Sequence, residues 1–115
     1  MITEDYCSFE TAKLLKEKGF NYPTLHYYYD KDGDLVFSYN IGAGKNEFVA
    51  PTLQMAMKWL REVHNLALNV CYLLGMWSYS VYRTDVSSSG FNSEDFDTYE
   101  EACEAGIRHC LENLI

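Results

Sequence analysis

Apolar residues recur every three or four positions in three segments of the chain, which predicts three amphipathic helices. The first runs from about Ser8 to Lys18, because Ser8 can cap its start and Gly19 can take the left-handed conformation that ends a helix. The second begins at Pro51, a favoured first helical position, and ends near Asn65. Both helices therefore have a start and a stop with a physical cause.

The clearest helix signal lies near the C-terminal end. Thr98 and Glu101 have the spacing of a capping box, in which each side chain can satisfy a free backbone donor. An apolar stripe follows, and Gly106 within it would let the helix backbone approach a sheet closely. The stripe consists of Ala102, Cys103, Gly106, Ile107, Cys110, Leu111 and Leu114.

Two β-hairpins are predicted between these helices. In the first, runs over 24–29 and 35–39 are rich in tyrosine, phenylalanine and valine, and Asp32-Gly33 suits a turn that needs positive φ. In the second, alternating runs over 67–72 and 77–83 flank a turn at Gly75. The segment from Thr84 to Ser93 is polar and serine-rich, so we expect a mobile surface loop there.

The predicted order is helix, β-hairpin, helix, β-hairpin, helix, which indicates an α+β fold with helices packed on an antiparallel sheet. At 115 residues the chain has the usual size of one domain, and no internal linker divides it. We therefore expect a single α+β domain over 1–115. With 48% hydrophobic residues it needs neither metal nor disulfide to fold.

Charge narrows the range of partners. Seventeen acidic residues against nine basic ones give a formal net charge of -8, which repels phosphate backbones and anionic membrane surfaces. Nucleic acid and membrane are therefore not expected as partners. The acids gather toward the C-terminal end, where the only nearby base is Arg108, so a charged partner of that end should be basic. They are Asp85, Glu94, Asp95, Asp97, Glu100, Glu101, Glu104 and Glu112.

The sequence predicts a cytoplasmic protein. Its start is acidic where a secretory signal would be basic, and its longest apolar stretch is too short to cross a membrane. In the cytoplasm its four cysteines would stay reduced, and their wide spacing matches no disulfide framework. They are Cys7, Cys71, Cys103 and Cys110.

Two segments suggest ligand loops but lack essential residues. The run 42–46 (Gly-Ala-Gly-Lys-Asn) has the glycines and lysine of a phosphate loop, but Tyr39 stands where a glycine is required and Asn46 where a serine or threonine is. Asp30, Asp32 and Asp34 have the alternate spacing of calcium ligands, yet no glutamate occupies the twelfth position. A plain loop and a solvated hairpin turn, with weak calcium binding left open, are the better interpretations.

No catalytic, cofactor or metal site is predicted. Cys103 and Cys110 lie two helical turns apart, roughly 10 Å, too far for one zinc ion, so we expect them to be small buried hydrophobes. His26, His64 and His109 could each act as a general base, but no neighbouring sequence identifies a nucleophile or an orienting carboxylate. The sequence thus favours a non-enzyme.

The ten tyrosines and two tryptophans favour protein recognition. Aromatic side chains bury much area at small entropic cost, and strand alternation turns some of them outward whichever face is buried. Tyr28 and Tyr82 are the partner-binding candidates on the predicted strands. The alternative is that half of the tyrosines line the core.

Two stretches carry a resemblance to a known family. They are the sixteen residues over 50–65, APTLQMAMKWLREVHN, and the eight over 98–105, TYEEACEA. The chain resembles short uncharacterised proteins of gut bacteria and of their phages or integrated mobile elements. This resemblance implies a phage-related accessory protein, without an activity or cofactor. It adds Trp59, Arg61 and His64 as candidate partner contacts, whereas packing, solvation and helix capping are their structural interpretations.

Three functions are therefore weighed. The first is a non-enzymatic accessory protein that binds another protein through exposed aromatics and its acidic C-terminal region. The second is an acidic mimic of nucleic acid that inhibits a host DNA-binding enzyme, and the third is a small enzyme without a recognisable motif. A homodimer is also open, since a free hairpin edge could pair across a two-fold axis.

Overall fold

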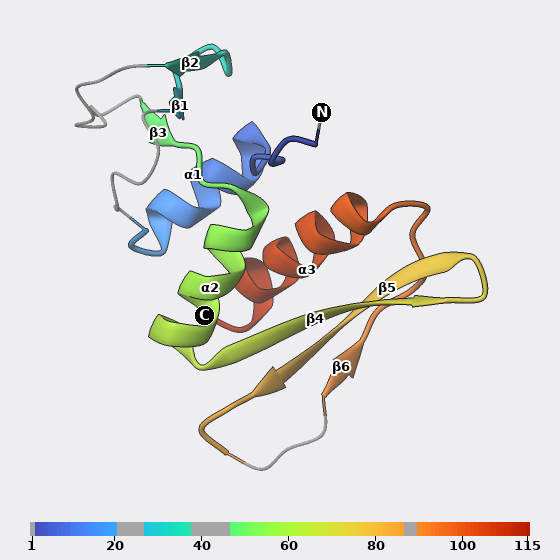
Figure 1. The fold of residues 1–115 in the computed structure, drawn as a ribbon. Helices are drawn as coiled ribbons and strands as arrows, with labels where there is room; N and C mark the ends of the chain where they lie inside the picture. Colours follow the sequence, from blue (N-terminus) through green and yellow to red (C-terminus); the bar gives the residue numbers. More distant parts are fainter. Residues whose placement is uncertain (1, 21–26, 38–46, 87–89) are drawn as a thin grey trace.

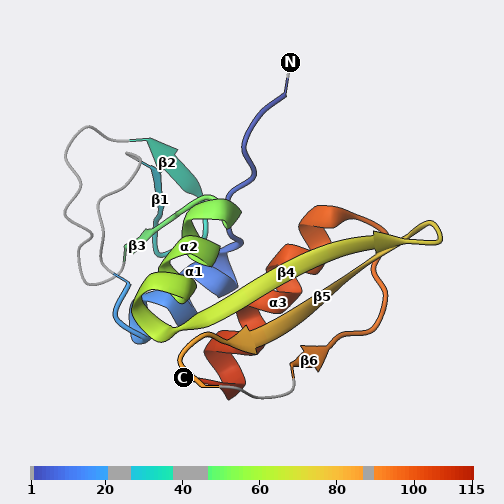
Figure 2. The same cartoon turned by 60° about the horizontal axis from the view of Figure 1, so that its bottom comes forward.

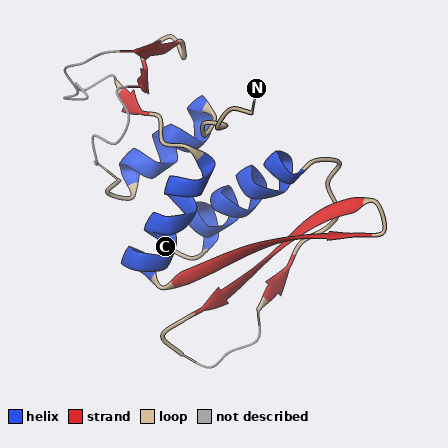
Figure 3. Ribbon diagram, viewed as in Figure 1, coloured by secondary structure: helices blue, strands red, loops and turns tan. Residues whose placement is uncertain are grey.

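The computed structural model describes residues 2–20, 27–37, 47–86 and 90–115, and it has the predicted α+β fold (Figure 1; Figure 3). The predicted order of helices and hairpins is confirmed, with two short strands added. The elements in chain order are α1 (Phe9–Glu17), β1 (Tyr27–Tyr29), β2 (Leu35–Phe37), β3 (Phe48–Val49), α2 (Leu53–His64), β4 (Leu66–Leu73), β5 (Met76–Arg83), β6 (Phe91–Asn92) and α3 (Tyr99–Asn113).

The caps predicted for α1 are confirmed. The Ser8 hydroxyl oxygen accepts a hydrogen bond from the Thr11 backbone N–H at 3.2 Å, which satisfies one free donor of the first turn. At the other end Gly19 has φ +98°, and the Phe20 N–H donates to the Leu15 carbonyl at 2.9 Å. This reversal turns the Phe20 side chain into the core, where it is 3% exposed.

The start of α2 differs from the prediction, and its end does not. Thr52 is the N-cap, and its hydroxyl oxygen accepts from the Met55 N–H at 3.1 Å. Pro51 therefore precedes the helix instead of opening it, because a side-chain acceptor one residue later satisfies the first turn. Asn65 ends α2 with φ 57°, the left-handed conformation expected there.

Helix α3 packs closely on a sheet through its glycine. Its N-cap is Thr98, whose hydroxyl oxygen accepts from the Glu101 N–H at 3.1 Å, as predicted. A Cβ atom at Gly106 would lie only 2.5 Å from a methyl carbon of Leu68 and 3.1 Å from the ring of Tyr79. The absence of a side chain at Gly106 thus permits the contact of α3 with β4 and β5.

The strands form two separate antiparallel sheets, with orders β2-β1-β3 and β4-β5-β6. Strands β3 and β6 were not predicted, and β6 lies inside the segment expected to be a loop. Each contains only two residues, which is too short for any alternation to be read from sequence. Residues 24–26 and 38–39 of the predicted first hairpin lie outside the described residues.

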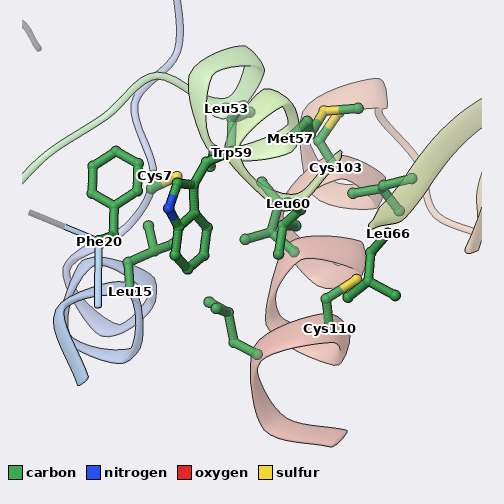
Figure 4. Packing of buried hydrophobic residues seen from close by; sticks show 14 of the residues in the cluster. Cys7, Leu15, Phe20, Leu53, Met57, Trp59, Leu60, Leu66, Cys103 and Cys110 are labelled. Carbon is green, nitrogen blue, oxygen red and sulfur yellow. The ribbon is translucent and has the colours of Figure 1, made fainter. Parts of the chain in front are cut away.

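The three helices lie between the two sheets, and the long β4–β5 hairpin extends past the end of the helical layer (Figure 1; Figure 2). Their apolar faces meet in one cluster with β4 and β5, which Figure 4 shows from close by. Fully buried members include Leu15 from α1, Leu60 from α2 and Ile107 from α3. In the part of the chain that the structure describes, no helix is both long and apolar enough to cross a membrane.

Candidate functional site

An open groove of about 900 Å³ runs along α3. Helix α3 forms one wall and the N-terminal segment 5–8 another, while Leu53, Phe96 and Ala105 supply apolar surface. We call it the acidic groove because its lining includes five carboxylates and one arginine. These charged residues are Asp5, Glu100, Glu101, Glu104, Glu112 and Arg108.

Backbone hydrogen bonds hold the N-terminal wall against the start of α2. The Cys7 N–H donates to the Pro51 carbonyl at 2.9 Å, and the Leu53 N–H donates to the Asp5 carbonyl at 2.9 Å. Cys7 itself is fully buried. Asp5 is therefore placed opposite α3 by a fixed stretch of backbone, although it precedes every helix and strand of the fold.

Two of the acids in the groove already have partners. One carboxylate oxygen of Glu104 accepts from the Ser8 backbone N–H at 2.9 Å and from the Thr11 hydroxyl, so it joins α3 to the start of α1. Its negative charge also suits the positive end of the α1 dipole. Glu112 forms an ion pair with Arg108, at 3.1 Å between carboxylate oxygen and guanidinium nitrogen. These two acids serve the fold and the helix surface.

Asp5, Glu100 and Glu101 remain as the exposed charge of the acidic groove. None of them forms an ion pair within the described ranges, where the two pairs present involve other residues. A second hollow of about 190 Å³ adjoins the groove, sharing Asp5 and Glu100 and adding Glu4. Like charges along a concave wall focus a negative potential there, which attracts cations.

Aromatic rings lie beside these charges. Phe96 packs on Tyr79 with ring centroids 6.1 Å apart, and Tyr6 packs on Tyr27 at 5.0 Å. His109 stacks on Phe91 at 4.2 Å and 16° between ring planes. The groove thus offers apolar and aromatic surface next to unneutralised carboxylates, a combination that suits side chains with a long apolar stem and a charged end.

The two tyrosines singled out from sequence lie far from each other in the topology. Tyr28 is half-buried in β1, where burial and the nearby Glu47 carboxylate raise the pKa of its hydroxyl. Tyr82 is 41% exposed on β5, in the other sheet. The structure does not bring them together, and neither lines the acidic groove.

The residues taken from the family resemblance lie at the C-terminal half of α2. Trp59 is 6% exposed and packs edge-on against Phe20, so it belongs to the core and offers no surface to a partner. Arg61 is exposed. The His64 ring packs on Trp59 at 4.6 Å, its Nε2 is buried without a hydrogen-bond partner, and burial lowers the pKa of the imidazole.

The three buried cysteines show no sign of nucleophilic activation. Burial raises the pKa of Cys103 to about 11 and that of Cys110 to about 12, and it raises the pKa of Cys7 well above its usual range. These three thiols are thus protonated at neutral pH and pack as small hydrophobes, which confirms the prediction for Cys103 and Cys110. Cys71, on β4, is the exposed one.

The predicted aspartate turn is confirmed as a hairpin turn. The Asp30 carboxylate accepts from the backbone N–H groups of Asp32 and Asp34 at 2.9 and 3.0 Å, and Gly33 has φ +85°. The three aspartates bring ligand atoms within 4.8 Å of one another, but Asp30 already serves the backbone of the turn. The segment 42–46 and His26 lie outside the described residues.

The acidic groove was predicted only as a charge asymmetry. Glu100, Glu101 and Glu104 belong to the acid-rich C-terminal end, but nothing in the sequence placed Asp5, Tyr6 and Ser8 beside them, since the contact of these residues with α3 spans almost the whole chain. No protein-family model matches the chain, and neither curated proteins nor solved structures contain a significant match.

Proposed function

We propose that this chain is a non-enzymatic accessory protein that binds a basic segment of a partner protein in the acidic groove. The observation that carries the proposal is the convergence of Asp5, Glu100 and Glu101 on one hollow, where Arg108 is paired with Glu112 and none of the three acids forms an ion pair among the described residues. An origin in phages or mobile elements remains part of the proposal through the resemblance at 50–65 and 98–105.

A lysine- or arginine-rich segment fits the groove because the apolar stem and the charged end of these side chains can both form contacts there. Their methylene stems can cover Leu53 and Ala105, while their charged ends reach the carboxylates of the walls. Isolated surface ion pairs stabilise little, so affinity would come from several charges acting together in a concave site. A partner with apolar residues between its basic ones uses both features.

The nucleic-acid mimic is less well supported by this geometry. A mimic must present its carboxylates outward to a protein that reads the convex DNA backbone. Here the acids line a hollow, Glu104 is bound to the start of α1, and Glu112 is paired with Arg108. A small enzyme is also less well supported: the described lining of the groove holds no thiol, its Ser8 hydroxyl serves the cap of α1, and its His109 stacks on Phe91.

The direct test measures binding of a fluorescent peptide that alternates lysine with leucine, by anisotropy at low salt. Glu100→Gln together with Glu101→Gln removes two of the three exposed charges, and we expect a dissociation constant about tenfold or more higher. The matched control is Glu94→Gln with Asp95→Asn, which removes the same charge outside the groove lining. Circular dichroism checks that each variant is folded.

Two results would overturn the proposal. One is an equal loss of affinity in the groove variant and its control, which would mean that net charge alone attracts the peptide. The other is a loss of binding in Tyr28→Ala or Tyr82→Ala that exceeds the loss in the groove variant, which would place the site on the sheets.

A further inference from the structure

The β4–β5 hairpin is an uncharged arm in a highly charged protein. No acidic or basic residue occurs between Asn65 and Arg83, although 23% of the whole chain is charged. At its tip the side chains of Tyr72, Leu73 and Leu74 are 60, 69 and 91% exposed. A long stretch without charge that exposes large apolar side chains marks a surface that is covered in the functional state.

Strand β4 also lies at the edge of its sheet, because the order is β4-β5-β6. Its eight residues pair with β5 without interruption, from Leu66 opposite Arg83 to Leu73 opposite Met76. Within the described ranges no strand pairs with the other side of β4. Its outer edge is therefore unpaired; Leu66 at its start is fully buried and Leu68 is 4% exposed, and the exposed part of the strand lies toward the tip.

The turn determines which backbone groups point outward. Leu74 and Gly75 have φ 52° and 86°, the two positive values of a type I′ hairpin turn. In such a hairpin the flanking residues, Leu73 and Met76, exchange hydrogen bonds, and the pattern then alternates along the strands. The N–H and C=O groups that point away from β5 are those of Leu66, Leu68, Val70 and Tyr72.

Proteins normally protect an edge strand with a lysine, a proline, a bulge or a short length. Strand β4 has none of these devices: its sequence is LALNVCYL, its register is unbroken and it is eight residues long. An edge left in this condition is a template for a further strand.

We propose that a second copy of this chain covers the edge, by antiparallel pairing of β4 with β4 across a two-fold axis at Asn69. In this register the outward N–H and C=O groups of one β4 strand meet those of the other and can form hydrogen bonds with them. Leu68 then lies opposite the partner subunit's Val70, so the two such pairs related by the axis carry the hydrogen bonds, whereas the fully buried Leu66 stays outside the ladder. Asn69 lies opposite the partner subunit's Asn69, on the exposed face of a six-stranded sheet.

Charge and apolar exposure favour a copy over an unrelated strand. Each chain carries a net charge of -8, so two copies can approach closely only along a surface without acids, and the β4 edge is such a surface. In this register the apolar tip of one copy reaches the end of α2 in the other, where Val63 is 48% exposed. The interface includes no lining residue of the acidic groove, so the two proposals stand or fall separately.

Disulfide trapping tests the register. In a background with Cys71→Ser, which removes the exposed thiol, Asn69→Cys places two cysteines directly opposite each other in a pair that lacks ladder hydrogen bonds, at a Cα separation of about 4.5 Å. We expect a covalent dimer on mild oxidation. Asn92→Cys, on the exposed strand β6 at the other edge of the sheet, is the matched control and should stay monomeric. Equal trapping of both variants, or of neither, overturns the proposal.

Sedimentation velocity tests the dimer without a cysteine. Asn69→Lys sets two like charges against each other at the axis and should raise the dimer dissociation constant by about tenfold, whereas Asn92→Lys should not change it. Asn69 is exposed and lies opposite Ser80, so the lysine leaves the core untouched. A wild-type chain that is monomeric up to about 200 µM contradicts the proposal and leaves an extended peptide of another protein as the occupant of the edge.

Discussion

The acidic groove and the β4–β5 hairpin differ sharply in charge. The groove gathers five carboxylates on two walls, whereas the hairpin has no charged residue from Leu66 to Tyr82. Each region has groups without a partner among the described residues. In the groove they are carboxylates without an ion pair, and in the hairpin they are the backbone groups of an edge strand and exposed apolar side chains. The difference indicates two kinds of occupant, a basic segment for the groove and an uncharged strand for the hairpin.

The two regions are joined at α3, which presents its acids to the groove and its apolar stripe to β4 and β5. Gly106 lies in that stripe, beside Leu68 and Tyr79, and Ala105 next to it lines the groove. A change at Glu101 need not reach the sheet, because Glu101 and Gly106 lie on well-separated sides of the helix. The following predictions test how far the two regions are independent.

Thiol labelling should give the largest contrast. Cys71 on the hairpin is exposed, while burial raises the pKa of Cys103 to about 11 and of Cys110 to about 12. In the native protein we expect one thiol to react with a disulfide reagent at least about 100-fold faster than the other three. Cys71→Ser should remove the fast phase. A second fast cysteine would show that the core beneath α3 is open, and would revive the enzyme interpretation.

Gly106→Val should weaken the packing of α3 on strands β4 and β5. The added side chain would meet Leu68 and Tyr79 at less than contact distance, which is overpacking, and we expect the free energy of unfolding to fall by about 1–3 kcal/mol. Urea denaturation measures the loss. Ala105→Val is the control, because it places the same side chain at a half-buried groove position and should change stability by less. Equal stability of the two variants would contradict the close contact of α3 with the sheet.

Thr98→Ala should affect the groove side alone. The Thr98 hydroxyl caps the turn that contains Glu100 and Glu101, and the loss of such a cap costs about 1 kcal/mol. We expect lower helix stability and weaker peptide binding, with the dimer dissociation constant unchanged. Thr98→Ser, which keeps the hydroxyl, should restore both quantities. A changed dimer constant would show that the regions are coupled through α3.

The smallest effect concerns His64 at the end of α2, just before the hairpin. Its folded-state pKa is lowered by burial, so the unfolded chain binds the proton first as the pH falls through the usual value near 6.5. Stability should therefore decrease on acidification through this range and change no further through His64 once the pH is below the folded pKa. His64→Gln should reduce the slope, and Val63→Gln should leave it in place. An unchanged slope in His64→Gln would assign the acid sensitivity to other groups.

Local signals account for the parts of the fold that were predictable. The caps Ser8 and Thr98 and the turns at Gly33 and Gly75 act within a few residues, and all four are confirmed. The two-residue strands β3 and β6 depend on pairing with distant partners, so periodicity could not reveal them. Trp59 shows the same limit among the predicted partner contacts, because packing against Phe20 from another segment shows that it is a core residue.

Charge was the part of the site that could be predicted. The acid-rich C-terminal end indicated a basic partner. The structure adds the wall formed by Asp5, and it shows that Glu104 binds the start of α1. Neither could be predicted, since each depends on the N-terminal segment meeting α3. Tyr28 and Tyr82 were chosen for their residue type, which says nothing about whether two rings share a surface.

One measurement tests the division of roles most directly: analytical ultracentrifugation of the chain with a labelled lysine-leucine peptide, over salt from about 20 mM to about 500 mM. Screening should release the peptide from the acidic groove, because its attraction is electrostatic. The same salt should strengthen the β4-paired dimer, because it reduces repulsion between two chains of net charge -8. Opposite salt responses are the predicted result, and peptide binding and self-association that rise or fall together would contradict the account.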